Sequence, residues 1–192
     1  MGQHYYPVLG DLHGTNVKVF DLSVDEQYTL SKLMEHSWWD NSFCNSFAKR
    51  LHNHKGRVIW CGCYTDDPND FAFEINSASY TPYYGEIWGE SIKRIGSKST
   101  DFSLDNKFLL NHDTRQFIDL NEYKQNSHNK YGWIINPLPL LTAIGNGRGG
   151  GDFPTNNVGA EFVGIWAWHL LSISDKHPKS YKKFNLIFKE IR

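Results

Sequence analysis

The chain has 192 residues, a formal net charge of −1 at pH 7, and apolar side chains at 40% of its positions. A chain of this length fits one domain of ordinary size, which we expect to span residues 1–192. It can bury a core without metal or disulfide cross-links. The nearly balanced charge excludes the basic surface that binds long nucleic acids, so we expect no long nucleic acid as a partner.

Cysteine content and hydropathy restrict the setting of the protein. Cys44, Cys61 and Cys63 are too few for a disulfide framework and have no second ligand pair for zinc, so they predict buried, reduced thiols. No apolar run approaches the roughly 20 residues that cross a bilayer, and Met1–Leu9 does not resemble a signal peptide. The sequence therefore predicts a cytoplasmic protein with no membrane partner, and it leaves homo-oligomerisation open.

Strands and short helices alternate in the first third of the chain. Tyr5–Leu9 and Val17–Phe20 predict two strands around a turn rich in glycine and asparagine. Asp25–His36 predicts a short helix, and Asp40 is the expected N-cap of a second helix with one apolar stripe. Arg57–Cys63 is rich in strand-forming residues.

The remaining elements are mostly strands. Residues 69–105 show no clear period, and Lys107–Leu110 and Arg115–Leu120 predict a hairpin. Three later segments also predict strands: Tyr131–Ile135, Phe162–Ser174 and Phe184–Ile191. This balance predicts an α+β fold, a single domain with a mostly antiparallel, aromatic-rich sheet and two or three helices.

A glycine-rich segment is the first candidate for a ligand site. It reads Gly145, Asn146, Gly147, Arg148, Gly149, Gly150, Gly151 and Asp152. The glycines match G-x-G-x-x-G, but Pro154 would break the helix that a dinucleotide fingerprint requires. Backbone N–H groups of such a segment can converge on a phosphate or carboxylate, with Arg148 adding a cation. The alternative is a structural turn of glycines with unusual φ angles.

Aromatic residues make up 15% of the chain and supply candidates for stacking on a ligand. His36 and Trp38 lie in a run with Trp39, and we include both in the predicted ligand site. Histidine is tunable near neutral pH, and nucleobases stack on exposed rings. For each ring, packing in the core is the alternative.

The segment Gly10–Gly14 resembles the first metal motif of calcineurin-like metallophosphoesterases, in which an aspartate and a histidine bind a metal ion. Here these residues would be Asp11 and His13. The nearest counterpart of a later motif of that family is His112 with Asp113. The glycine and glutamate that flank the family's later motif are missing, and a polar turn explains Gly10–Gly14 equally well.

A second resemblance spans nearly the whole chain. Met1-Gly2-Gln3 with Tyr5-Tyr6, the segment Leu33–Trp38, Asn111-His112, and Pro137–Ala143 running into Gly145–Asp152 are similar to a family of uncharacterised bacterial and phage-borne proteins. That family brings no established activity. A phage or mobile-element setting would imply a role in host defence, such as sequestering a defence signal.

These observations predict a binding protein for a small anionic or nucleotide ligand, without a cofactor or a recognisable catalytic set. The first alternative is a metal-dependent phosphoesterase or other hydrolase that uses Asp11, His13, His112, Asp113 or Asp152. The second is a protein-interaction module that inhibits a host factor, in which the glycine-rich segment is purely structural.

Overall fold

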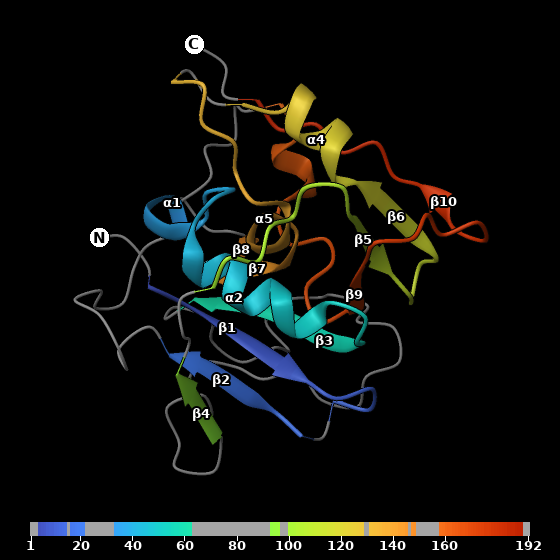
Figure 1. Cartoon of the computed structure of the whole chain (residues 1–192). Helices are drawn as coiled ribbons and strands as arrows, with labels where there is room; N and C mark the ends of the chain where they lie inside the picture. Colours follow the sequence, from blue (N-terminus) through green and yellow to red (C-terminus); the bar gives the residue numbers. More distant parts are fainter. Residues whose placement is uncertain are drawn as a thin grey trace.

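The computed structural model of the chain describes residues 4–14, 16–21, 33–62, 93–96, 100–128, 131–145, 147–148 and 158–189 (Figure 1). In these ranges the chain forms an α+β fold with a mostly antiparallel sheet, as the sequence predicts. None of the described helices is both long and apolar enough to cross a bilayer.

The sheet is built around strand β3. Its strands are β1 (Tyr5–Gly10), β2 (Lys18–Asp21), β3 (Gly56–Gly62), β4 (Lys93–Gly96), β5 (Phe108–Asn111), β6 (Gln116–Asp119), β7 (Ala143–Gly145), β8 (Gly147–Arg148), β9 (Leu170–Ser174) and β10 (Lys182–Lys183). Their order is β10-β6-β5-β9-β3-β1-β2-β4, and β7 with β8 branches from β3. Figure 1 shows β1, β2 and β4 on one side of β3 and β5, β6, β9 and β10 on the other.

Helices pack on one face of this sheet. They are α1 (Leu33–His36), α2 (Ser42–Leu51), α4 (Leu120–Asn126), α5 (Pro137–Thr142) and the 3-10 helix η3 (Ala160–Phe162). Asn41 caps α2 through side-chain bonds from Phe43 N and Cys44 N, at 3.0 and 3.1 Å. The cap is thus one residue later than the Asp40 that the sequence predicted, because the Asn41 side chain makes both bonds.

Both faces of β3 are buried, which explains its continuous apolar run. Val58 and Trp60 lie in the larger core beneath α2, where Trp60 packs edge-to-face on Phe47 at 4.9 Å between centroids. Ile59 and Cys61 lie in a smaller core on the opposite face. Cys44 and Cys61 are buried and neither forms a disulfide, in agreement with the prediction of reduced thiols, while Cys63 lies outside the described residues.

The early strands and the hairpin β5–β6 confirm the sequence predictions, but three later ones are wrong. In the predicted strand Phe162–Ser174, only Leu170–Ser174 is extended, because η3 and turns occupy residues 160–168, with positive φ at Gly164 and Trp168 (73° and 59°). Residues 131–135 form only a single bridge at Ile135, and residues 184–188 lie outside any strand. The C-terminal strand is instead β10.

Trp168 explains two glycines of the turn between β1 and β2. Its indole lies against Gly10 and Gly14, and a Cβ atom on Gly10 would meet Trp168 Cη2 at 2.7 Å. Gly14 has a φ of +74°, which side chains rarely tolerate. The glycines of the segment that resembles a metal motif are therefore used for close packing and chain reversal.

Candidate functional site

The glycine-rich segment begins as a tight hairpin rather than as an irregular loop. Strands β7 and β8 pair antiparallel, with Ile144 opposite Arg148 and Gly145 opposite Gly147. Strand β7 also extends the sheet, since Ala143 pairs with Trp60 of β3. Asn146 and Gly149–Asp152 lie outside the described residues, so the proposed anion-binding nest stays a prediction.

His36 is a buried core histidine. It ends α1, is 3% exposed, and its Nε2 accepts a hydrogen bond from Trp60 Nε1 at 2.9 Å. The Cys44 thiol donates to the His36 carbonyl oxygen at 3.0 Å. Burial raises the pKa of this thiol far above its ordinary value, so Cys44 stays protonated. In this arrangement the imidazole of His36 contributes to packing and to the buried hydrogen bond with Trp60, and not to an open surface.

Trp38, in contrast, belongs to a surface cluster of three rings that we call the aromatic surface: Trp38, Tyr131 and Trp133. Tyr131 is 69% exposed and Trp133 is 56% exposed, while Trp38 is half-buried. The Trp38 and Trp133 centroids are 4.8 Å apart in an edge-to-face contact, and those of Tyr131 and Trp133 are 6.1 Å apart. A bridge between Trp38 and Ile135 holds the two segments side by side.

The two segments from which the sequence predicted a metal site meet at one arginine. Arg57 of β3 is 6% exposed. Its Nη1 donates to Asp113 Oδ2 at 3.1 Å and to the Trp168 carbonyl oxygen at 3.0 Å, and its Nε donates to the Leu12 carbonyl oxygen at 3.2 Å. The guanidinium thus supplies the positive charge between the turn at Leu12 and the carboxylate of Asp113.

Asp11 and His112, two other predicted metal ligands, bond to groups of the protein, and Asp152 lies outside the described residues. Asp11 accepts from His13 N at 3.0 Å and from Asn16 Nδ2 at 2.7 Å, as in an Asx turn. Both ring nitrogens of His112 have protein partners, described below. Within the described ranges, no three histidine, cysteine or acidic side chains lie close enough together to hold a metal ion.

A second polar cluster surrounds His112 on the β5–β9 side of the sheet. Its Nδ1 lies 2.7 Å from Tyr181 Oη and its Nε2 lies 2.8 Å from Ser172 Oγ. Burial, assisted by the positive charge of Lys55, lowers the pKa of His112 to about 4, so the imidazole is neutral near pH 7. Burial also lowers the pKa of His169. The cluster ties the Tyr181 segment to β9, and sequence analysis missed it because Ser172 and Tyr181 belong to no motif.

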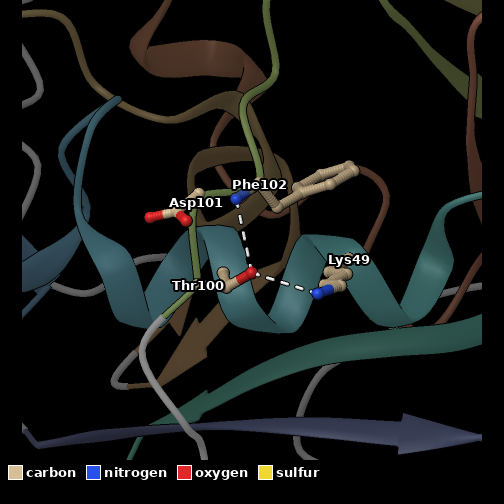
Figure 2. Close-up of a pocket in the computed structure, with 4 residues that line it drawn as sticks. All are labelled: Lys49, Thr100, Asp101 and Phe102. Carbon is tan, nitrogen blue, oxygen red and sulfur yellow. Dashed lines mark hydrogen bonds between the residues drawn. The ribbon is translucent and has the colours of Figure 1, made fainter.

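A shallow pocket of about 430 Å³ opens beside α2 (Figure 2). Lys49 of α2 lines one side, and Thr100, Asp101 and Phe102 of the segment that leads to β5 line the other. Thr100 Oγ1 accepts from Lys49 Nζ and from Phe102 N, each at 3.3 Å. Sequence analysis missed these residues because they lie at the end of the stretch 69–105, which shows no period.

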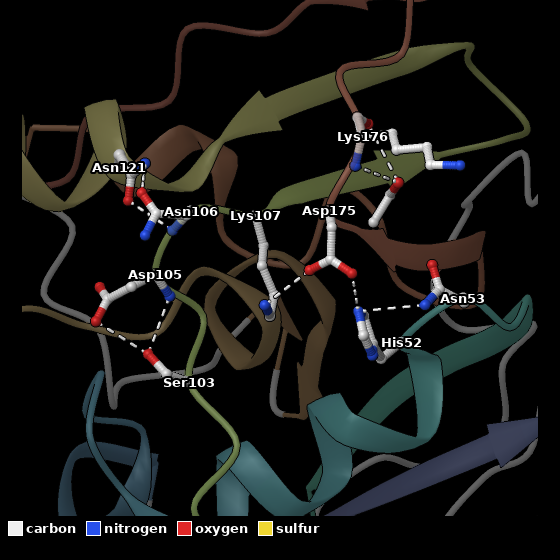
Figure 3. A network of polar contacts seen from close by, with 10 residues as sticks. His52, Asn53, Ser103, Asp105, Asn106, Lys107, Asn121, Asp175 and Lys176 are labelled. Carbon is white, nitrogen blue, oxygen red and sulfur yellow. Dashed lines mark hydrogen bonds and ion pairs between the residues drawn. The ribbon is translucent and has the colours of Figure 1, made fainter.

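An ion-pair network borders this pocket (Figure 3). Asp175 accepts from Lys107 Nζ at 2.8 Å and from His52 Nε2 at 2.7 Å. These two bonds, with that of Lys107 the stronger, lower the pKa of the Asp175 carboxyl. Lys107 Nζ and the His52 ring in turn lie 5.4 and 5.2 Å from the centre of the Phe102 ring. The network therefore holds the Phe102 ring in place, and the opposite charges of Lys107 and Asp175 compensate each other.

Comparisons of the chain with protein-family models, with curated proteins and with solved structures give no match.

Proposed function

We propose that the protein binds a small nucleotide or a nucleotide-derived signal. The base would stack on the aromatic surface, and the glycine-rich segment would hold the phosphates. The observation that carries this proposal is that Trp60 of β3 contacts the chain next to both regions.

Trp60 connects the two regions. Its backbone pairs with Ala143, two residues before Gly145, and its indole bonds to His36, two residues before Trp38. The start of the glycine-rich segment and the base of the aromatic surface are therefore each within a few residues of the same tryptophan. This shared contact with Trp60 supports one ligand in contact with both regions.

The exposed rings themselves favour a planar ligand. Trp133 and Tyr131 are more than half exposed, so a planar ligand can reach their rings. Stacking of one base on an aromatic side chain contributes about 1–3 kcal/mol, regardless of which base it is. The phosphates would then add hydrogen bonds from backbone N–H groups and from Arg148.

Isothermal titration against mononucleotides, cyclic nucleotides and ADP-ribose derivatives tests the proposal. We expect Trp133→Ala to weaken binding by about 5- to 150-fold and Trp133→Phe to retain most of it. Arg148→Met should weaken ligands in proportion to their phosphate charge. Leu12→Ala is the matched control, because Leu12 is 49% exposed and lies in the turn between β1 and β2. The absence of binding across the panel at millimolar ligand would contradict the proposal.

The same protein variants and ligands distinguish a binding protein from a metal-dependent hydrolase. Turnover of a bound nucleotide or of a phosphodiester after addition of Mn²⁺, lost in Asp113→Asn, would favour the hydrolase. Binding without turnover would favour the binding protein. If the panel fails and Trp133→Ala abolishes the capture of one host protein, the aromatic surface is a protein-binding site.

A further inference from the structure

We propose that the pocket beside α2 binds a small zwitterion, namely a free α-amino acid with an apolar side chain. This ligand and this site are separate from the nucleotide site. The proposal rests on the donors, the charges and the apolar ring of the four residues that line the pocket: Lys49, Thr100, Asp101 and Phe102.

The hydroxyl of Thr100 is positioned to donate to a ligand. A hydroxyl has two lone pairs and one hydrogen. Lys49 Nζ and Phe102 N use the two lone pairs, and the hydroxyl hydrogen has no acceptor among the described residues, so it can point at a ligand. Lys49 keeps two further N–H groups, since its ammonium makes this one hydrogen bond among the described residues. Adjacent donors from an ammonium and a hydroxyl suit the two oxygens of a carboxylate.

Asp101 supplies the opposite charge. Lys49 and Asp101 line the same pocket but form no ion pair with each other, and Figure 2 shows them on either side of the Thr100 hydroxyl. In the described part of the chain, no cation pairs with Asp101. A doubly charged phosphate would be repelled by this carboxylate, and a simple amine would be repelled by Lys49. A ligand with one carboxylate and one ammonium matches both charges.

Phe102 gives the pocket an apolar wall. The ring packs on the main core, and two members of the network in Figure 3 flank it: Lys107 Nζ and the His52 ring lie 5.4 and 5.2 Å from its centre. Because Asp175 already pairs with Lys107 and bonds to His52, Lys49 and Asp101 are the charged side chains of the described lining that are left to face a ligand. The volume of about 430 Å³ lies within the usual range for small-molecule sites and is ample for one amino acid.

Titration calorimetry with L-leucine and two blocked analogues tests the proposal. N-acetyl-L-leucine lacks the ammonium group and L-leucinamide lacks the carboxylate. We expect each analogue to bind at least about tenfold more weakly than leucine, because each leaves one charge of the pocket without its partner. Inorganic phosphate should not compete.

Two variants test which side chain of the pocket binds each charged group of the ligand. Lys49→Met should weaken leucine binding and make leucine and leucinamide bind alike, whereas Asp101→Asn should make leucine and N-acetyl-leucine bind alike. Lys179→Met and Glu161→Gln are exposed controls that should change nothing, and urea denaturation confirms that all variants fold.

Three results would overturn the proposal: no leucine binding at millimolar concentration, equal binding of all three compounds, or stronger binding of phosphate in Asp101→Asn than of leucine in the wild type. Nucleotide titrations of the same variants should be unaffected, so failure of this site and failure of the proposed nucleotide site are distinguishable.

Discussion

Replacing Arg57 with methionine tests whether one guanidinium holds three segments of the chain together. Its head donates to the turn at Leu12, to the carbonyl oxygen of Trp168 and to the carboxylate of Asp113. Methionine preserves most of the apolar stem but removes every donor. The variant therefore leaves two carbonyl oxygens and one carboxylate without this partner.

The expected loss follows from the burial of the ion pair. Removing one member of a buried pair costs about 3–5 kcal/mol, because the remaining charge is uncompensated. The Asp113 side chain is 18% exposed and keeps a bond from Leu170 N at 3.1 Å, so we expect the lower end, about 3 kcal/mol. In the double variant Arg57→Met/Asp113→Asn, about 1–2 kcal/mol of this loss should be recovered, since no orphaned charge remains.

Urea denaturation followed by circular dichroism measures the four corners of this double-mutant cycle. The surface pair Lys124–Asp105, with side chains 35% and 44% exposed, provides the control, and its coupling free energy should be below about 1 kcal/mol. The assigned role of Arg57 is wrong if Arg57→Met lowers the free energy of unfolding by less than about 1 kcal/mol. It is also wrong if the coupling free energy of Arg57 with Asp113 does not exceed that of Lys124 with Asp105.

Three further variants probe the fold. The pKa of His112 is lowered to about 4 from an ordinary value of 6.5, so the unfolded chain binds a proton at a higher pH than the folded chain does. The urea midpoint of unfolding should therefore fall as the pH drops from about 6.5 to 4. The fall should be less steep in His112→Gln, which lacks this group. Trp60→Phe should cost about 3 kcal/mol in the same denaturation assay, because it leaves a cavity and removes the buried hydrogen bond to His36. In Gly159→Ala the new Cβ would lie 2.1 Å from a carbonyl oxygen at a φ of +85°, so the loss should exceed that of Gly132→Ala, where φ is +80° and no atom lies within 4 Å.

Local patterns predicted the parts of the fold that local energetics decide. The run Val58–Cys61 predicts a strand because strand-forming side chains alternate across two buried faces. The turn between β5 and β6 follows from Asn111, whose side chain accepts from Asp113 N and Thr114 N. Both features depend on residues that are close in sequence.

The same patterns failed where tertiary packing overrides them. Ile165–Leu171 alternates like a buried strand, yet Trp168 adopts a positive φ that places its indole against Gly10 and Gly14. The pocket beside α2 was equally hidden, because Lys49 and Thr100 are 51 residues apart and meet only in the folded chain. Of the predicted ligand residues, Trp38 lies in a surface cluster, whereas His36 is buried against Trp60.

The division of one edge of β3 between two partners has a mechanical consequence. Strand β9 pairs with this edge at Gly56 and Arg57, and β7 pairs with it at Trp60 and Cys61. The ladder that joins the two halves of the sheet is therefore only two residue pairs long. Relative motion of the two halves of the sheet should therefore be largest at this short ladder, where the hydrogen bonds of the Arg57 side chain also connect the two halves. Amide protons at Gly56–Val58 should accordingly report the relative motion of the two halves before any strand separates from its own neighbours.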